Sequence, residues 1–446
     1  MAIQLALDIA LKGPCVTGSA SNVVGLVRLA IDLGACTVGG PLSDREAATV
    51  HAAMDCCPSE ISLRTATRHA ILSGEDPLGD MLCAARPPDE RRRAGAFYTP
   101  PSIVKPMVSW AMGQSPVRVV DAGCGSGRFS AAVSRERPDV QIIAVDDDPV
   151  ATILTRACLS ALGARNATVI QSDFLTLDLP RIPGRTAYLS NPPYVRHHEL
   201  SAATKSLGAS LAAGLNLPFS GLAGLHTHFY LAAARSMRAD DVGCFVTSSE
   251  WLDIGYGKTI RQLLCDRLST VSLHAACPRS TPFDDVMTTA VISCFEADSS
   301  NKATAVGWHD ELGSLANLAS GTDVPRAVFQ SSERWSAIVR NGVPIKSSER
   351  MVPLGSVVRV HRGVVTGSNE FFVLDADRAA ALGLSQWCHP AVTRAQEILE
   401  CGGTVRRQHN TKLLLDIPRS NHRERGSRLD KYLRTGEAST GGLLAI

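Results

Sequence analysis

The sequence lacks most of the features that would place it outside ordinary globular proteins. Its 446 residues contain no apolar run of the roughly 18 residues that a membrane helix needs. The first residues, Met1 to Leu11, lack the basic start of a secretory signal. Gly and Pro are scattered, which excludes collagen and wholesale disorder, and no heptad pattern indicates a coiled coil. We therefore expect a soluble cytoplasmic protein with no membrane partner.

Cysteine spacing also excludes one class of site. The 13 cysteines include the adjacent pair Cys56 and Cys57, but no two have the C-x-x-C spacing of a zinc or redox motif. The count is odd, and most of them stand singly in apolar surroundings. A reducing compartment fits this usage, and a structural zinc site does not.

What charge there is lies unevenly along the chain. The formal net charge is only +2, but residues Ser331 to Ile446 hold 17 Lys or Arg against 11 Asp or Glu. Since this stretch has a balance of +6, the preceding 330 residues sum to −4, which is close to neutral for their length. A neutral front and a basic rear suggest that the rear meets a polyanion such as nucleic acid, although a basic run is often only a solvated surface.

The pattern of apolar residues divides the chain into four parts. Residues 1–90 form a helical N-terminal segment without a catalytic constellation, with helix-like stretches at Asn22 to Leu33, Asp44 to Met54 and Glu60 to Leu72. Residues 91–300 form the expected catalytic domain, and 301–350 a connection with some local structure. Residues 351–446 form a smaller C-terminal domain, with strand-like alternation at Leu354 to Val360 and Gly363 to Leu374.

Within residues 91–300, seven β-rich runs alternate with helix-sized spacers. They are Val117 to Val120, Gln141 to Val145, Thr168 to Gln171, Thr186 to Leu189, Cys244 to Thr247, Val271 to His274 and Thr288 to Phe295. This alternation predicts an α/β fold with a doubly wound, mostly parallel sheet. The last two runs are too close for a helical crossover, so we expect them to pair as an antiparallel hairpin. Ahead of the first run, Ser102 could cap a helix over Ile103 to Met112.

The first predicted strand ends in a glycine-rich turn, Asp121-Ala-Gly-Cys-Gly-Ser-Gly127. Gly123, Gly125 and Gly127 would let the backbone approach a ligand at the carboxyl edge of the sheet. The spacing is G-x-G-x-G, not the G-x-G-x-x-G of dinucleotide sites, and a plain tight turn or a different nucleotide is the alternative.

Acidic residues follow the next two strands. Asp146 stands where a carboxylate can accept hydrogen bonds from both hydroxyls of a ribose, while Asp147 and Asp148 fit a helix cap better. Asp173-Phe174 offers an acceptor beside an aromatic plane, suited to an adenine. A core Phe with a solvated Asp explains that pair equally well.

The fourth strand ends in the most informative stretch, Asn191-Pro192-Pro193-Tyr194. Prolines stiffen the turn and donate no hydrogen bonds, so the Asn191 amide oxygen and the Pro192 carbonyl can both point into a cleft. Two such acceptors on the N–H groups of a ring-conjugated amine localise its lone pair on nitrogen. Tyr194 would supply a flat surface for the ring. The alternative is an ordinary proline turn after a strand.

These motifs, in the order Phe97-Tyr-Thr-Pro-Pro101, Asp121 to Gly127, Asp146, Asp173-Phe174 and Asn191 to Tyr194, resemble the γ-class DNA adenine-N6 methyltransferases of restriction-modification systems. The resemblance covers residues 95–296 and continues more loosely to about 375. It implies a class I, Rossmann-like fold with S-adenosyl-L-methionine as cofactor. It implies double-stranded DNA as partner, a cognate restriction endonuclease encoded separately, and a role in modification or phage defence. No nuclease cluster of carboxylates and lysine is visible, so we expect modification without cleavage.

The resemblance also implies roles for particular residues. Thr99 would contact the methionine part of the cofactor, Asp121 with Gly123, Gly125 and Gly127 would line its site, Asp146 would hold the ribose, and Asp173 with Phe174 would hold its adenine. The catalytic residues would be Asn191, Pro192, Pro193 and Tyr194. Phe283 would stack on the other side of a flipped-out base, unless it is only a core residue before the last strand.

Three features qualify this expectation. In relatives, more sequence normally follows a stretch like Tyr432 to Glu437, so the target-recognition domain is expected to be short; Arg359 and Arg362 read as phosphate contacts in it. Asn-Pro-Pro-Tyr also resembles the methyltransferases that modify glutamine in release factors. A catalytically inactive DNA-binding module is the third alternative.

His197-His198 and His226-x-His228 are expected in polar loops, the first pair with DNA contact as an alternative, and no metal is expected.

Overall fold

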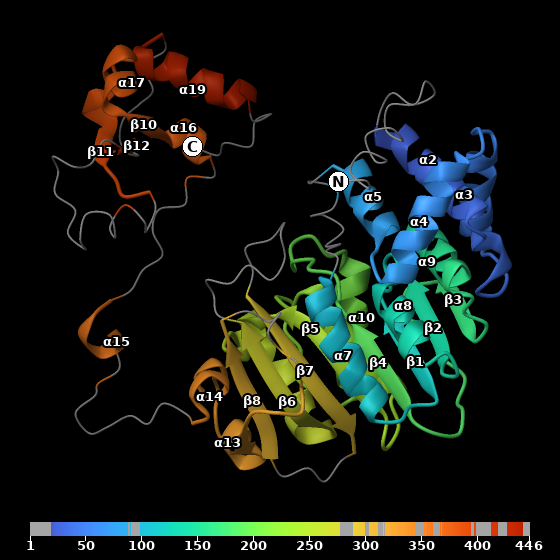
Figure 1. The fold of residues 1–446 in the computed structure, drawn as a ribbon. Coiled ribbons are helices and arrows are strands. Elements are labelled where there is room, and N and C mark those ends of the chain that lie inside the picture. The colour runs from blue at the N-terminus through green and yellow to red at the C-terminus, as the bar shows by residue number, and fades with distance from the viewer. Residues whose placement is uncertain are drawn as a thin grey trace. The chain divides into compact units, whose positions relative to one another are not determined.

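The computed structural model describes residues 19–87, 90, 99–276, 289–298, 303–310, 315, 317–343, 352, 354–359, 366, 368–393, 397, 412–417 and 426–439. Contacts within the chain divide it into two units, Met1–Lys346 and Ser347–Ile446. The first unit carries a nine-stranded sheet with the order β3-β2-β1-β4-β5-β7-β6-β8-β9 (Figure 1).

The strands of this sheet are β1 Arg118–Ala122, β2 Gln141–Asp146, β3 Ala167–Gln171, β4 Thr186–Ser190, β5 Val242–Ser248, β6 Leu268–Ala276, β7 Ala290–Ala297, β8 Ala303–His309 and β9 Thr322–Pro325. The first five pair in parallel, and β7 runs antiparallel between β5 and β6. All seven predicted strands and the antiparallel hairpin are confirmed.

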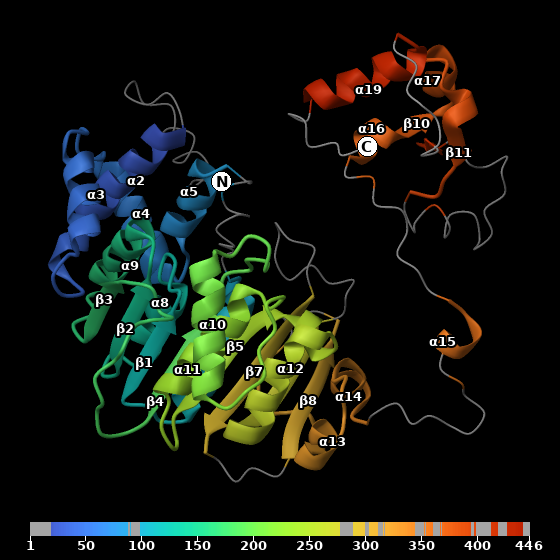
Figure 2. The ribbon, with the colours of Figure 1, turned by 180° about the vertical axis from the view of Figure 1, so that it is seen from behind.

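Helices cover both faces of the sheet, as the doubly wound prediction requires. Figure 1 shows one face, covered by α7 Pro101–Gly113, α8 Arg128–Glu136 and α9 Pro149–Leu162. Figure 2 shows the other, covered by α10 Ala202–Gly214, α11 Leu225–Ser236 and α12 Lys258–Gln262. Short helical turns η2 Ser249–Leu252, η3 Gly255–Gly257 and η4 Leu263–Arg267 flank α12.

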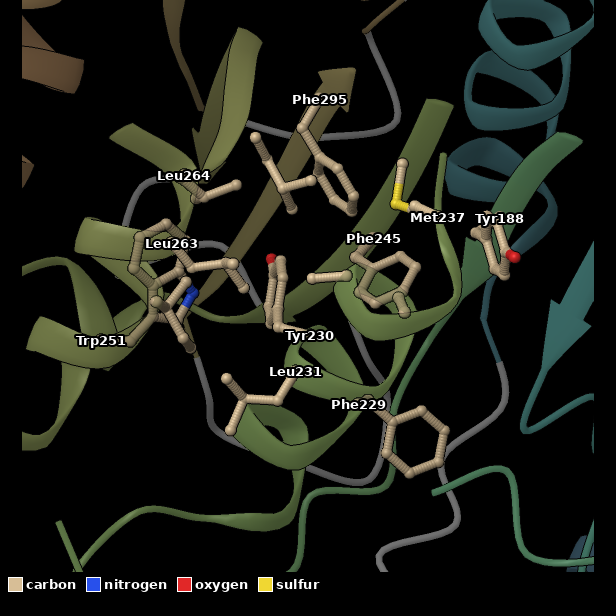
Figure 3. Packing of buried hydrophobic residues seen from close by; sticks show 14 of the residues in the cluster. Tyr188, Phe229, Tyr230, Leu231, Met237, Phe245, Trp251, Leu263, Leu264 and Phe295 are labelled. Carbon is tan, nitrogen blue, oxygen red and sulfur yellow. The ribbon is translucent and has the colours of Figure 1, made fainter. Parts of the chain in front are cut away.

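The core on the α11 side is aromatic. Tyr230 of α11 packs against Phe245 of β5 and Phe295 of β7, with ring centroids 5.0 and 5.8 Å away (Figure 3). Its hydroxyl bonds Ser293 Oγ at 2.6 Å, which satisfies the one polar atom of this ring in the core. This packing fixes α11 on the strands that follow the Asn191 turn.

The N-terminal segment is helical, as predicted, and packs against α9. Its elements are α2 Ser19–Asp32, η1 Ala35–Thr37, α3 Asp44–Met54, α4 Ile61–Ser73 and α5 Pro77–Ala85. Helix α3 begins with a capping box, in which Ser43 and Glu46 exchange side-chain to backbone hydrogen bonds. Glu46 also pairs with Arg156 of α9 at 2.8 Å, with both side chains fully buried. Gly39 forms a bridge to Thr168 on the outer edge of β3.

Several expectations about local structure were wrong. The expected seven-stranded sheet has two further strands, because β8 pairs in parallel with β6, and β9 pairs with β8, in the stretch expected to be a connection. Helices α13 Arg326–Gln330 and α14 Ser336–Asn341 follow them. Helix α7 begins after Pro100, with proline in its first turn, so Ser102 is not its cap.

The second unit has a small three-stranded sheet of its own. Its elements are α15 Leu354–Val357, α16 Asn369–Phe372, β10 Val373–Asp375, α17 Ala376–Ala381, η6 Ser385–Trp387, β11 Cys388–Pro390, β12 Lys412–Leu415 and α19 Arg428–Ser439. Phe371 stacks on Tyr432 at 4.6 Å, and the Tyr432 hydroxyl donates to the Phe371 carbonyl. The prediction of a strand at Leu354 to Val360 is wrong, because this stretch contains the short helix α15.

Candidate active site at the carboxyl edge of the sheet

The glycine-rich turn after β1 is held by the end of β2. The N–H groups of Gly123 and Cys124 donate to the Val145 carbonyl at 2.8 and 2.9 Å. The N–H of Gly125 donates to Asp146 Oδ2 at 2.8 Å. Gly123, Gly125 and Gly127 all have positive φ, at 73°, 56° and 88°. A side chain would strain each of these positions, which explains the glycine spacing.

Asp121 supports this turn from beneath. Its carboxylate is completely buried and accepts hydrogen bonds from the N–H and the hydroxyl of Ser130, at 2.9 and 2.6 Å, in the first turn of α8. Burial raises the pKa of Asp121 to about 6, although the two Ser130 donors favour the carboxylate. We therefore expect Asp121 to act on a cofactor through the loop that it holds.

Asp146 is half-buried at the end of β2. Besides the Gly125 bond, its Oδ1 accepts from the N–H of Asp148 at 3.0 Å. Burial raises the pKa of Asp146 to about 7, and the nearby Asp148 and Asp147 raise it further against these two donors. Asp148 caps α9 as expected, through Val150 N, whereas the Asp147 carbonyl accepts from Arg45. Asp146 therefore changes charge near neutral pH, above the pKa of Asp121.

Asp173 and Phe174 follow β3 directly. Asp173 is exposed, and its Oδ1 accepts from the Leu175 N–H at 2.9 Å, which shapes the turn. Phe174 is 5% exposed, and its ring lies 5.4 Å from that of Phe229 in α11. A methyl group added at Gly123 would lie 3.4 Å from Phe229. The aromatic pair and the glycine turn are thus neighbours.

Asn191 directly follows β4, is half-exposed, and lies beside the same glycine-rich turn. Ser190, just before it, donates to the Ala122 carbonyl at 2.6 Å, which ties the ends of β4 and β1 together. The Asn191 Nδ2 donates to the hydroxyl of Thr99 at 3.1 Å. Thr99 is 4% exposed and precedes α7. Thr99, predicted at the cofactor, and Asn191, predicted at the target amine, therefore contact each other.

The rest of the Asn191 motif lines the same edge. Pro192 is buried, Pro193 half-buried, and Pro193 Cδ would lie 3.9 Å from a methyl group at Gly123. Tyr194 is half-buried against the core on the α7 side of the sheet, and burial raises the pKa of its hydroxyl. All the predicted site residues that can be located lie on this edge. Phe283 is outside the described residues, as are most of the basic residues between Arg406 and Arg434.

The second predicted histidine pair lies in a helix and not in a loop. His226 and His228 lie in helix α11 and are buried, so the polar loop expected for them is wrong. Burial lowers the pKa of His226 to about 4. Among the described parts of the chain, no group of three His, Cys, Asp or Glu side chains is arranged to hold a metal ion.

Three residues of this edge were missed by the sequence analysis: Phe229, Asp76 and Arg128. Phe229 gave no signal, because an aromatic residue in an apolar helix is usually core. Arg128 did give one. It is the first residue of α8, where the helix dipole disfavours a cation, so a specific carboxylate partner was to be expected. That partner is Asp76, at 2.6 Å.

The residues present fit S-adenosylmethionine by their chemistry. The half-buried Asp146 carboxylate suits a ribose diol, and the exposed Asp173 carboxylate beside Phe174 suits an adenine. The glycine turn beside Asp146 offers backbone without side chains. No described helix is long and apolar enough to cross a membrane.

The sheet order and this edge define a class I, Rossmann-like methyltransferase. Residues 110–212 match the methyltransferase small domain family, and residues 338–441 match the family "Type II methyltransferase M.Eco57I, C-terminal domain". The type II methyltransferase M.XamI of Xanthomonas campestris pv. amaranthicola is 40% identical over 365 residues, which are 81% of this chain and 67% of that protein. The chain belongs to the type II methyltransferases of restriction-modification systems.

More distant relatives include both DNA methyltransferases and a methyltransferase of release factors. M.AccI of Acinetobacter calcoaceticus is 23% identical over 69% of this chain and 58% of its own length. The chain thus spans only about three fifths to two thirds of these two relatives. The release factor glutamine methyltransferase of Escherichia coli is 36% identical, but over only 84 residues. In fold, the type IIL enzyme MmeI in complex with DNA matches 87% of this chain and 57% of its own, with a TM-score of 0.51 and 14% identity.

Proposed function

We propose that the chain transfers the methyl group of S-adenosylmethionine to N6 of an adenine in double-stranded DNA, as the modification enzyme of a restriction-modification system. The observation that carries this proposal is the Asn191 turn. Its amide nitrogen is engaged by Thr99, and its Pro193 lies beside Gly123 of the cofactor loop. Asn191 and the Pro192 carbonyl would then accept hydrogen bonds from the adenine amine and localise its lone pair.

The chain's own residues contribute mainly by positioning. When bound, the cofactor supplies an electrophilic methyl group on sulfur. Asp146 and Asp173 would hold it at the ends of β2 and β3, and Asn191 would hold the amine in line with the methyl carbon at about 3 to 3.5 Å. The proton that the adenine nitrogen gives up after methylation would pass to solvent. Tyr194 would stack on the flipped base, with Phe283 proposed on its other side.

The main competing function is glutamine methylation in a release factor. The Escherichia coli relative matches over only 84 residues and favours it, whereas residues 338–441 match the C-terminal domain of a type II methyltransferase and favour DNA. Purified protein given tritiated S-adenosylmethionine should label DNA and not release factor. A catalytically inactive DNA-binding module would instead bind no S-adenosylmethionine in a calorimetric titration.

Expression in a host that lacks adenine methylation tests the proposal directly. We expect N6-methyladenine at one recurring sequence when the host genome is read for modified bases. Asn191→Ala should reduce methylation at least about 100-fold, because it removes an acceptor that acts on the reacting amine. Its affinity for S-adenosylmethionine should stay nearly unchanged. Full methylation by this variant, or none by the wild-type chain, contradicts the proposal.

A further inference from the structure

The N-terminal segment reaches the glycine-rich loop through Asp76. This residue caps α5, its Oδ1 accepting from the Gly79 N–H at 2.9 Å. Its other oxygen, Oδ2, accepts from Arg128 Nε at 2.6 Å and from the hydroxyl of Ser126 in the loop. Asp76 is 13% exposed and Arg128 16% exposed. A single carboxylate outside the sheet therefore holds both the loop and the first residue of α8.

Arg128 uses the remaining edges of its guanidinium in two other directions. One terminal nitrogen donates to Asp80 of α5 at 2.8 Å, and the other donates to the backbone carbonyl of Thr99 at 2.8 Å. Because a guanidinium is planar and rigid, two carboxylates on one side fix where its third edge points. The position of the Thr99 carbonyl is thus set by helix α5.

Thr99 joins this arrangement to the Asn191 turn. Its carbonyl is held by Arg128, and its hydroxyl accepts from Asn191 Nδ2 at 3.1 Å. An amide whose nitrogen is engaged in one direction presents its oxygen in the opposite one. A shift of Thr99 would therefore turn the Asn191 oxygen away from the target amine.

We propose that Arg128 is a positioning residue for methyl transfer, and that the helical segment of residues 19–87 supports the active site by anchoring it through Asp76. This inference rests on the proposed function of Asn191. It gives the N-terminal segment a role in the reaction, although none of the residues proposed to contact the target adenine or the cofactor belongs to that segment.

The sharpest variant is Arg128→Lys. A lysine can keep the ion pair with Asp76, but its single nitrogen cannot also reach Asp80 and the Thr99 carbonyl in the geometry of a guanidinium. We expect cofactor affinity and melting temperature close to those of the wild type. The single-turnover rate of methyl transfer, at saturating cofactor and DNA, should fall by about 100-fold, as expected for a small misplacement of the acceptor.

Arg135→Met is the matched control. Arg135 also lies in α8 and also donates to the N-terminal segment, at the Ile71 carbonyl, 2.8 Å away. It has no contact with Thr99, so its loss should leave the rate within about twofold of the wild type. An equal loss of rate in both variants would mean that any loosening of the segment suffices, and would overturn the role of Arg128.

A double variant tests whether Arg128 acts through Thr99. Thr99→Val removes the hydroxyl that Asn191 uses, so adding Arg128→Lys to it should cost little more. Fully multiplicative losses would contradict the inference. If the wild-type chain methylates no DNA, the proposed function fails, but a crystal structure of Arg128→Lys still tests the positioning role. In that structure the distance from Asn191 Nδ2 to Thr99 Oγ1 should exceed about 3.5 Å, the limit of a hydrogen bond. An unchanged distance of 3.1 Å would refute the positioning role of Arg128.

Discussion

At the scale of single residues, the site depends on a few side chains whose hydrogen bonds are made before any ligand arrives. Asp121 is hydrogen-bonded to Ser130, Asn191 to Thr99, and Arg128 to Asp76. These hydrogen bonds hold the side chains in place, so fewer side chains must become ordered when a substrate binds. Asp146 differs, because its two backbone partners leave lone pairs available for a ribose.

The raised pKa of Asp146 predicts that cofactor affinity depends on pH. With a pKa of about 7, this group is ionised at pH 8 and mostly protonated at pH 6. Protonation occupies one acceptor position, so affinity for S-adenosylhomocysteine should fall about tenfold from pH 8 to pH 6. Isothermal titration calorimetry at several pH values measures this.

Asp146→Asn provides the control for that titration. It cannot ionise, whereas the amino group of the ligand titrates equally in both proteins. The variant should bind more weakly at pH 8 and show a flatter pH profile. Identical profiles for the two proteins would assign the dependence to the ligand or to Asp121, whose pKa is about 6.

Sequence alone could predict those site residues that stand at the ends of strands. Gly123, Asp146, Asp173 and Asn191 follow β-rich runs directly, and parallel strands bring such positions to one edge. It could not predict the pairing of Asp76 with Arg128, because 52 residues separate them and a solvated Asp at a helix start is common. The contact depends on how the N-terminal helices pack on α9, which the local pattern does not encode.

At the scale of elements, weak local sequence patterns explain several of the differences from expectation. Helix α5 was not predicted, because it has only nine residues and, apart from Asp80, no charged residue that would mark a polar face. Strands β8 and β9 lie in the stretch expected to be a connection, because both are bordered by polar residues and β9 has only four residues. The pairing of β8 with β6 and of β9 with β8 is a tertiary effect, which overrides weak local preference.

The glycine-rich turn offers a prediction at this scale. Gly127 begins α8 and Gly163 ends α9, both in the left-handed region, with φ of 88° and 70°. An added methyl group would lie 3.0 Å from Thr155 at Gly127, but would meet nothing within 4 Å at Gly163. Gly163→Ala should cost about 1 kcal/mol of unfolding free energy, from backbone strain alone. Gly127→Ala should cost at least about 1 kcal/mol more.

Chemical denaturation of the two alanine variants measures this difference. Gly163→Ala serves as the control for backbone strain without crowding. Equal losses in both would mean that Thr155 moves freely, and that the turn is looser than its hydrogen bonds to Val145 and Asp146 indicate.

At the scale of the whole molecule, the two units predict separable binding. The sheet, the site and the N-terminal helices all lie in Met1–Lys346. The stretch from Arg406 to Arg434 in the second unit has nine Lys or Arg against three acids. A chain ending at Lys346 should keep its S-adenosylmethionine affinity, yet lose at least about tenfold in DNA affinity, with a shallower dependence on salt.

Fluorescence anisotropy with labelled DNA at several salt concentrations measures that loss. The full chain with Lys412→Gln and Lys431→Gln, both exposed, is an intermediate case and should show a smaller decrease. Unchanged DNA binding by the shortened chain would assign the DNA contacts to the first unit alone. A lower melting temperature together with weaker cofactor binding would instead show that the units are not separable.

Each border of the large sheet carries a feature that disfavours pairing with another strand. On the β3 side, Gly39 accepts from the Val169 N–H at 2.9 Å, so the N-terminal segment occupies a position that a foreign strand would otherwise take. On the other side, β9 is only four residues long and ends in Pro325, which cannot donate. Removing residues before Asp44 would uncover the β3 border, and such a shortened protein should self-associate in light scattering where the intact one does not.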